Sequence, residues 1–299
     1  MDSARTQRSS SLNLRIGDIT FAVTSDDPGL TLEAQGPVRH FIVDGGEPDV
    51  RLRAAWGRSC EVPAGEQLFN AGTIWQLHRH GHGYLFRFTA PASGSEPYRT
   101  ASFNPEFTSG EVCLREDCFR SGQPVYPLQY PLDELLMVHV LAQGRGVEVH
   151  GCGVADSDGR GYLFLGESGA GKSTMARLWT RRAGPRILSD DRIILRMLDG
   201  RLWMYGTPWH GEAELASARR TPVDRIFFLA RGEKNEIAPL HEAEAVARLM
   251  ACSFVPFHSR PGLDFTLTFL EQVTTAVACA RFRFVPGERA VEFVREHAA

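Results

Sequence analysis

The sequence contains almost no lysine. Of its 33 basic residues only Lys172 and Lys234 are lysines, and arginine supplies the rest of the positive charge. The ammonium group of lysine is a compact point charge, whereas the guanidinium group of arginine is a wide planar fork, so the two do not substitute freely for each other. A chain that uses arginine almost everywhere therefore makes each lysine a candidate for a specific role.

The sequence also lacks runs of basic residues, long apolar stretches and a clustered set of cysteines. The formal net charge is −3 and the arginines are scattered, which gives no indication of a nucleic-acid partner. No stretch reaches the length of a membrane span, and the N-terminal segment holds no apolar core typical of a signal peptide. The six cysteines are spread along the chain, which favours reduced thiols over a disulfide framework. We therefore expect a cytoplasmic protein without a membrane partner.

A length of 299 residues suits about two domains. The first part, residues 1–128, consists of short runs rich in aromatic and β-branched residues, separated by Gly, Pro, Asp and Ser, a pattern typical of strands. The expected strands span residues 18–23, 40–44, 50–56, 73–80, 84–90, 100–104 and 110–116. In the run "YLFRFTA", Tyr84, Phe86 and Phe88 alternate with other side chains and give one aromatic face. We predict an antiparallel, β-rich N-terminal domain.

The second part, residues 129–299, changes to alternating strands and helices. A helix is expected at residues 130–144, with Pro131 near its start and Gly144 as its stop. The expected strands then span residues 147–155, 162–166, 186–198, 223–230 and 281–285, and the expected helices span residues 172–182, 241–252, 263–279 and 288–297. Alternation of this kind predicts an α/β domain.

The α/β part carries a motif for phosphate binding. The stretch "GESGAGKS" satisfies the P-loop pattern and lies between an expected apolar strand and an expected helix. Its glycines allow backbone N–H groups to turn toward a phosphate, and the helix N-terminus adds its partial positive charge. The residues expected to bind nucleotide are Gly166, Glu167, Ser168, Gly169, Ala170, Gly171, Lys172, Ser173 and Thr174. Ser173 is also expected to bind the Mg²⁺ that bridges the phosphates of ATP.

Two acidic residues follow the P-loop helix without another motif in between. Asp190 and Asp191 interrupt the apolar run of the strand expected at residues 186–198. Because side chains alternate along a strand, one carboxylate is expected to face the phosphate and the other to lie beyond it or along the strand edge. One acid can bind Mg²⁺ while the other accepts a proton from an attacking hydroxyl, and the sequence leaves open which does which. A solvated strand end with two acids is the alternative interpretation.

His150 lies on the strand that precedes the P-loop strand. If the two strands form a hairpin, His150 comes near the phosphate loop or near its opposite end, depending on the register. A histidine packed in the core is the alternative. The order of His-Gly, P-loop and Asp-Asp makes His150 a candidate acid-base or phosphate-orienting group.

The runs "VHGCGVA", "FLGESGAGKST" and "ILSDDRIIL", in this order and at these spacings, resemble the kinase domain of HPr kinase/phosphorylase. That family belongs to the phosphoenolpyruvate-carboxykinase-like P-loop group, and the resemblance covers roughly residues 146–195. It implies a P-loop α/β kinase domain of this type, preceded by the β-rich domain, with ATP and Mg²⁺ as cofactors. It also implies that one Asp of the pair accepts the proton of a serine hydroxyl with the help of His150, while Lys172 and Ser173 bind nucleotide and metal.

The sequence departs from the family after the acidic pair. The Arg-Gly-rich signature of HPr kinase is not found as such, and the N-terminal half does not resemble that of HPr kinase. By analogy with the family, Glu212 in "WHGEAE" is expected as a further acidic metal ligand, and Arg219 or Arg220 as a substitute for its basic loop. We therefore expect the phosphate acceptor to be a serine of a protein or peptide other than HPr.

Taken together, these features predict a Mg-ATP-dependent kinase for a serine-type hydroxyl on a protein or peptide. Its catalytic residues are expected to be Asp190, Asp191, His150 and Lys172, and its metal ligands Ser173, Asp190, Asp191 and Glu212. The alternative, from another class of protein, is a catalytically silent ATP-binding regulatory or scaffold module. The sequence leaves open whether the chain forms a homo-oligomer.

Overall fold

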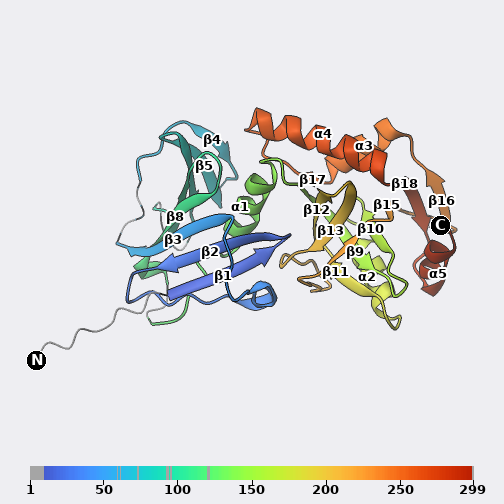
Figure 1. Cartoon of the computed structure of the whole chain (residues 1–299), viewed down its shortest axis with the longest axis horizontal. Coiled ribbons are helices and arrows are strands. Elements are labelled where there is room, and N and C mark those ends of the chain that lie inside the picture. The colour runs from blue at the N-terminus through green and yellow to red at the C-terminus, as the bar shows by residue number, and fades with distance from the viewer. Residues whose placement is uncertain are drawn as a thin grey trace, which may run out of the picture. The chain divides into compact units, whose positions relative to one another are not determined.

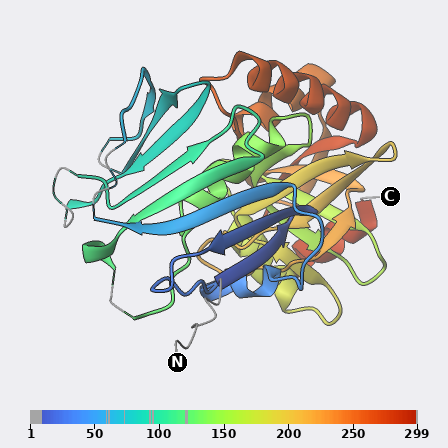
Figure 2. The same cartoon turned by 60° about the vertical axis from the view of Figure 1, so that its left-hand side comes forward.

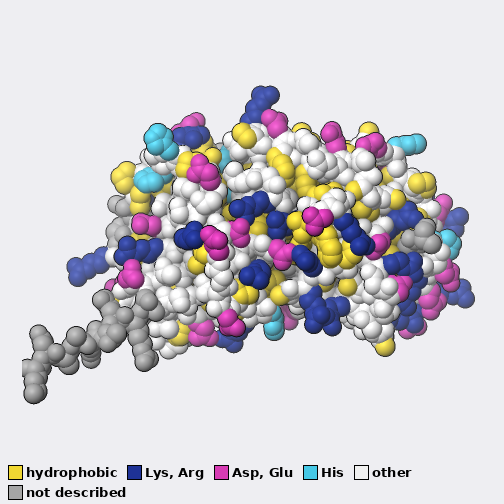
Figure 3. Space-filling model, viewed as in Figure 1, with side chains coloured by type: hydrophobic (Ala, Val, Ile, Leu, Met, Phe, Trp, Pro, Cys, Tyr) yellow, Lys and Arg dark blue, Asp and Glu magenta, His cyan; other side chains and the backbone are white. Residues whose placement is uncertain are grey.

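The computed structural model describes residues 10–58, 60, 62–72, 74–91, 94, 96–119 and 122–297. It is a mixed α/β structure with two large sheets, and the chain divides into two compact units, Met1–Leu136 and Met137–Ala299. The division falls inside helix α1 (Leu132–Leu141), whereas the sequence predicts a boundary between residues 128 and 129. None of the helices in the described ranges combines the length and hydrophobicity needed to cross a bilayer. Basic and acidic side chains are intermixed on the face seen in Figure 3.

The first unit is built on one eight-stranded sheet, which Figure 2 turns toward the viewer. Its strands are β1 (Ser10–Ile16), β2 (Ile19–Ser25), β3 (Val50–Gly57), β4 (Gln67–Asn70), β5 (Trp75–His80), β6 (Gly83–Phe88), β7 (Arg99–Phe103) and β8 (Ser109–Arg115). They lie in the order β1-β2-β3-β8-β7-β6-β5-β4. The aromatic alternation predicted in the sixth strand is present, since Phe86 and Phe88 are fully buried and Tyr84 stacks on Phe107 at 4.9 Å between ring centroids.

Two expectations for this unit were wrong. The sheet is not purely antiparallel, because β3 pairs in parallel with both β2 and β8. Parallel neighbours need a long crossover, and the 24 residues between Ser25 and Val50 provide one. Part of that crossover is the 3₁₀ helix η1 (Gly36–Phe41), which overlaps the strand expected at residues 40–44. Pro37 at the first turn of η1 fixes a helical φ and lacks an N–H for sheet pairing.

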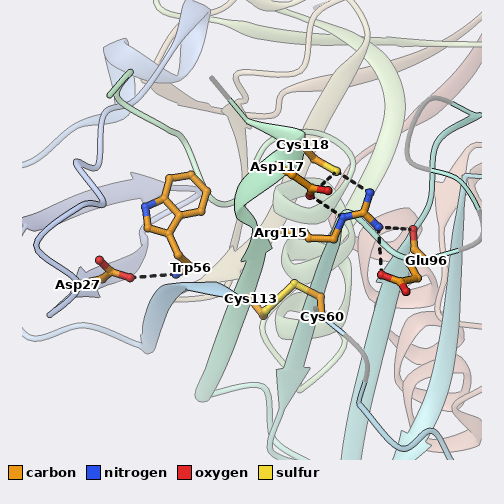
Figure 4. Close-up of a disulfide and its surroundings, with 8 residues drawn as sticks. All are labelled: Asp27, Trp56, Cys60, Glu96, Cys113, Arg115, Asp117 and Cys118. Carbon is orange, nitrogen blue, oxygen red and sulfur yellow. Dashed lines mark hydrogen bonds and ion pairs between the residues drawn. A yellow bond between two sulfur atoms is a disulfide. The ribbon is translucent and has the colours of Figure 1, made fainter. Parts of the chain in front are cut away.

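The cysteines of the first unit also differ from expectation. Cys60 and Cys113 form a disulfide between the segment after β3 and strand β8 (Figure 4). This pairing contradicts the expectation of reduced thiols, which rested on the spread of the cysteines along the sequence. The free thiol of Cys118 lies nearby on the 3₁₀ helix η3 (Glu116–Cys118), where it accepts a hydrogen bond of 2.9 Å from Arg115. Pairing across 53 residues depends on the fold of the sheet and has no local sequence signal.

The disulfide is expected to stabilise the first unit by restricting its unfolded chain. For a closed loop of this size the stabilisation should be about 2–4 kcal/mol. Denaturant unfolding of the Cys113→Ser variant, followed by a probe in the first unit, should therefore give a free energy of unfolding lower by that amount. The matched control is Cys118→Ser, which removes an exposed free thiol and should change the midpoint little. Equal midpoints for Cys113→Ser and the wild type would contradict this prediction.

The second unit contains a ten-stranded sheet and four further helices. Its strands are β9 (Val147–Ala155), β10 (Gly161–Leu165), β11 (Arg186–Ser189), β12 (Arg192–Leu198), β13 (Arg201–Gly206), β14 (Arg220–Pro222), β15 (Arg225–Arg231), β16 (Glu236–Pro239), β17 (Ser253–Phe254) and β18 (Cys279–Phe284). Its helices are α2 (Lys172–Thr180), α3 (Glu242–Ala251), α4 (Arg260–Ala276) and α5 (Glu288–His297). The main path of the sheet runs β14-β13-β12-β9-β10-β15-β18-β16, and β11 and β17 both pair with β9.

Two hydrophobic cores lie on the two faces of this sheet. One combines Leu163 and Leu165 of β10 with Leu249 of α3 and buried residues of α4. The other combines Tyr162 and Phe164 of the same strand with buried residues of α2 and α5. Because neighbouring side chains of a strand point to opposite faces, the continuous apolar run of β10 serves both cores. The unit is thus a sheet with helices on both faces, as Figure 1 shows.

Strand β9 lies at the centre of the sheet and changes its pairing partner on both edges near His150 and Gly151. On one edge, β10 pairs with residues 151–155 and β17 with residues 148–149. On the other edge, β11 pairs with residues 153–155 and β12 with residues 147–150. The backbone N–H of His150 donates to Cys252 at 2.7 Å, and that of Gly151 donates to Asp191 at 3.0 Å. On each edge of β9, one partner strand therefore ends and another begins next to His150.

The strand expected at residues 186–198 is in fact two strands. β11 ends at Ser189, β12 begins at Arg192, and the acidic pair lies in the break. Local polar groups stabilise this break, since Ser189 Oγ accepts hydrogen bonds from the N–H groups of Asp191 (3.3 Å) and Arg192 (3.2 Å). The apolar runs on each side gave no sign that the pairing shifts at the aspartates.

Candidate functional site

The glycine-rich loop, residues 166–171, connects β10 to α2. Its glycines have positive φ angles of 154° at Gly166, 82° at Gly169 and 109° at Gly171, a region that other residues rarely adopt. At Gly171 a Cβ atom would also lie 2.6 Å from the ring of Phe284, so a larger residue is excluded there on two counts. No side chain caps the N-terminus of α2. The first N–H groups of this helix are thus available to an anion.

Lys172 begins α2 and turns back toward the loop. Only 6% of the residue is exposed, and its Nζ donates to the carbonyl oxygens of Gly166 (2.7 Å) and Glu167 (3.1 Å). Burial lowers the pKa of Lys172, and the charge of Asp191 opposes this effect. The Asp191 carboxylate is therefore close enough to favour the charged form of Lys172.

Asp191 and His150 form a hydrogen-bonded pair at the partner switch of β9. His150 Nε2 donates to Asp191 Oδ1 at 2.8 Å, and the guanidinium of Arg192 contacts Asp191 Oδ2. Burial raises the pKa of Asp191, but the hydrogen bond from His150 and the charges of Arg192, His150 and Lys172 outweigh it, so the net pKa is lowered. Asp191 is therefore an ionised carboxylate at neutral pH. The side chains of His150 and Asp191 are 31% and 26% exposed, so a small polar group can reach them from solvent.

Asp190 has a different environment, although it precedes Asp191 directly. The residue is 1% exposed, and its carboxylate accepts hydrogen bonds from the N–H groups of Gly211 (3.0 Å), Ala213 (2.9 Å) and Leu215 (3.3 Å). Gly211 is required at its position, because a Cβ atom there would lie 2.9 Å from Asp190 Oδ2. Asp190 thus fixes the loop at residues 211–215, and Asp191 is the acid that contacts His150.

The different environments predict different consequences for the two acids. Asp190→Ala leaves three backbone N–H groups without their charged acceptor, so the free energy of unfolding should fall by about 3 kcal/mol or more. Asp191→Ala removes a half-buried carboxylate and should lower stability clearly less. Denaturant unfolding of both variants, followed by a probe in the second unit, measures the difference. An Asp190→Ala variant as stable as the wild type would contradict the role of Asp190 in holding this loop.

The remaining predicted residues have different environments. Ser173 and Thr174 are half-buried in the first turn of α2. Glu212 is exposed and follows Gly211 on the loop that Asp190 holds, so its role as a metal ligand stays a prediction. Arg219 is exposed just before β14, whereas Arg220 belongs to β14 and places its guanidinium 4.8 Å from the centroid of the Trp203 ring. Arg220 is thus part of a sheet edge and does not fit the prediction of a mobile basic loop.

The side chains of this site fit a metal ion that is bound jointly by the protein and by nucleotide phosphates better than one bound by the protein alone. Within the described ranges, no three His, Cys, Asp or Glu side chains gather in a way that could hold a metal ion. Mg²⁺ in nucleotide sites commonly uses only one or two protein ligands, with phosphates and water completing its shell. Asp191 and the Ser173 hydroxyl are partly exposed and would supply such ligands, because each Asp191 oxygen keeps a lone pair beside its contact with His150 or Arg192. Asp190 is 1% exposed, and its carboxylate accepts from three backbone N–H groups, so it does not fit this requirement.

Two further polar residues join the site without having been predicted. Arg192 contacts Asp191, lies 3.6 Å from the buried carboxylate of Glu148 and places its guanidinium 4.4 Å from the centroid of the Phe254 ring. Its position directly after the acidic pair was the only available signal. Cys252 follows the end of α3, and its thiol has a raised pKa: burial raises it by more than the hydrogen bond from the backbone of Gly166 and the charge of Lys172 lower it.

A cavity of about 410 Å³ opens beside the glycine-rich loop. One wall is residues 166–170, and the end of β15 contributes Phe228, Leu229 and Ala230. The end of α3 contributes Arg248, Ala251 and Cys252 to the wall. The loop therefore borders a space large enough for a small ligand, and one guanidinium group, that of Arg248, lines the same space.

Comparison with known proteins gives little further support. No family model matches the chain, and no curated protein matches it. Among solved structures, the Hpr(Ser) kinase/phosphatase from Coxiella burnetii has a TM-score of 0.31 and 15% sequence identity, and the match covers 50% of this chain and 95% of that chain. This is a weak similarity to a kinase/phosphatase over half of the chain. A function must therefore be inferred from the geometry of the site itself.

Proposed function

We propose that this protein is a Mg-ATP-dependent kinase that phosphorylates a serine-type hydroxyl on a protein or peptide. The proposal rests mainly on one observation: the pairing of Gly151 with Leu165 brings the His150–Asp191 pair, 2.8 Å apart, beside the glycine-rich loop that begins at Gly166 and leads to Lys172. A phosphate-binding cation and an acid paired with histidine are the groups that phosphoryl transfer to a hydroxyl requires.

The phosphates of ATP would bind at the loop and at the N-terminus of α2. The uncapped N–H groups of the helix provide donors, and Lys172 would exchange its bonds to the loop carbonyls for bonds to phosphate oxygens. Asp191 and Ser173 would hold Mg²⁺, which when bound neutralises the charge of the phosphates. The low pKa of Asp191 keeps its carboxylate ionised and available for this role at neutral pH.

The transfer itself requires the His150–Asp191 pair. The acceptor hydroxyl attacks the γ-phosphorus, the bond from that phosphorus to the β,γ-bridging oxygen breaks, and ADP leaves with the electron pair. The hydroxyl proton passes to the His150–Asp191 pair, within which the carboxylate orients the ring and stabilises its protonated form. The partial exposure of both side chains allows an acceptor carried on a peptide to approach them.

A transfer assay tests this function. The full chain is incubated with Mg²⁺, γ-labelled ATP and a degenerate serine-containing peptide library, with the corresponding alanine library as the control. We expect label on the serine library only, and its loss in Asp191→Asn. ATP binding without label transfer to any serine peptide or cellular protein fraction would overturn the kinase proposal and favour the silent ATP-binding module.

A further inference from the structure

The part of the cavity wall that the end of α3 contributes carries one basic side chain. Arg248, Ala251 and Cys252 line this wall, and their spacing of three and four residues places them on one face at the end of α3. The adjacent face of α3 is fixed in the core by Ala245 and Leu249, which are 1% and 0% exposed. The core therefore holds the wall, and with it the Cα of Arg248, in a defined position.

A carboxylate orients this arginine from one side. Arg248 Nε donates to Glu244 Oε1 at 2.9 Å, and the same oxygen accepts from Arg281 Nη2 at 2.7 Å. Glu244 thus bridges two guanidinium groups. The hydrogen bond from Arg248 lowers the pKa of Glu244 most, and the one from Arg281 lowers it further. Glu244 binds Nε of Arg248. The two terminal nitrogens of the Arg248 guanidinium group, Nη1 and Nη2, point away from that hydrogen bond.

We propose that Arg248, which lines the same cavity as the glycine-rich loop, binds the phosphate chain of the nucleotide from the end of α3. A guanidinium group recognises phosphate oxygens with two parallel hydrogen bonds and keeps its charge at all relevant pH values. Arg248 would supply a positive charge from the end of α3, whereas the charge of Lys172 comes from the start of α2. This inference rests on the proposed function only in so far as a nucleotide binds at the loop, and it does not require transfer.

The simplest other explanation is that Arg248 only stabilises the helix. Arginine pairs with glutamate at a spacing of four residues on many exposed helix surfaces, and near a helix C-terminus its charge is favourable. Arg281 allows the two explanations to be separated. It shares the same Glu244 oxygen and has similar partial exposure, but it lies on β18 and does not line the cavity.

The experiment measures the affinities of the full chain for MgATP and MgADP by calorimetry at several salt concentrations. The variants are Arg248→Ala, Arg248→Lys and the control Arg281→Ala, and the thermal unfolding of each is recorded. We expect Arg248→Ala to weaken binding about tenfold or more and to reduce the salt dependence of the dissociation constant, because one phosphate contact is lost. Arg248→Lys should restore part of the affinity, and Arg281→Ala should change it less than about twofold, since its only shared partner is Glu244.

The outcomes separate this inference from the proposed function. Equal affinities of Arg248→Ala and the wild type would overturn the inference and leave the kinase proposal intact. A loss of equal size in Arg281→Ala would also overturn it, because the effect would then pass through Glu244. Loss of affinity in Arg248→Ala together with an absence of transfer in the wild type would support Arg248 as a phosphate ligand and overturn the kinase. No binding of either nucleotide by the wild type would overturn both.

Discussion

Replacing Lys172 with arginine is expected to weaken MgATP binding about 100-fold, which corresponds to about 2.7 kcal/mol. Charge is conserved in this variant, so the loss comes from shape. The Lys172 ammonium group occupies a buried position against the carbonyl oxygens of Gly166 and Glu167, where the wider guanidinium fork does not fit. Calorimetric titration with MgATP measures the effect.

The chain offers a matched control for this substitution. Lys234 is the only other lysine and is exposed, so Lys234→Arg should leave the affinity unchanged. Thermal unfolding of both variants shows whether either has lost its fold. Full affinity in Lys172→Arg would mean that the phosphate chain does not contact this ammonium group.

Asp191→Asn is expected to reduce the rate of phosphoryl transfer by about 10²–10⁴. The amide is isosteric but uncharged, so it neither stabilises a protonated His150 nor binds a metal as a carboxylate does. Single-turnover transfer from γ-labelled ATP measures the loss at saturating nucleotide. Asp190→Glu is the comparison variant. This substitution should lower the free energy of unfolding of the second unit and change the transfer rate of the folded protein much less. A wild-type rate in Asp191→Asn would remove the His150–Asp191 pair from the reaction.

The lowered pKa of Asp191 also predicts how these effects depend on pH. Its folded-state pKa lies below the ordinary value of 3.8, so the ionised carboxylate stabilises the fold above about pH 3.8, and this contribution is lost as the pH falls through the folded pKa. The stability difference between wild type and Asp191→Asn should therefore shrink as the pH falls below about 3.8, whereas the titration of Asp191 itself adds no pH dependence to it from about pH 5 to 8. Over the same window Asp191 contributes no acid limb to the transfer rate. A rate that falls in this range must reflect another group.

Much of the second unit could be predicted because its signals are local. The strand expected at residues 147–155 and the helix expected at 288–297 have the observed bounds, and the helix expected at 172–182 begins at Lys172 as predicted. Apolar runs, the glycine-rich turn and the spacing of motifs along the chain carry this information. The sequence predicts two possible positions for His150, near the phosphate loop or near the opposite end of the strand, depending on the β9–β10 register. In the observed register Gly151 pairs with Leu165, which places His150 near the loop.

What could not be predicted depends on segments far apart in the sequence. Asp190 and Asp191 have the same local context, and only the loop at residues 211–215 separates their roles. Arg248 and Cys252 join the glycine-rich loop from a helix about 80 residues further on, with nothing but a helical pattern to mark them. In the first unit, the parallel pairing of β3 and the disulfide of Cys60 likewise depend on long-range contacts. Local propensity does not encode such contacts.

The central claim is that the metal-bound phosphates lie between the glycine-rich loop and the His150–Asp191 pair. Paramagnetic relaxation of the His150 ring protons by bound Mn-ATP tests it most directly, with Mg-ATP as the diamagnetic control and His150→Gln to assign the signal. We predict that the His150 resonance broadens strongly when the site fills with Mn-ATP. An unbroadened His150 resonance at saturating Mn-ATP would contradict the claim.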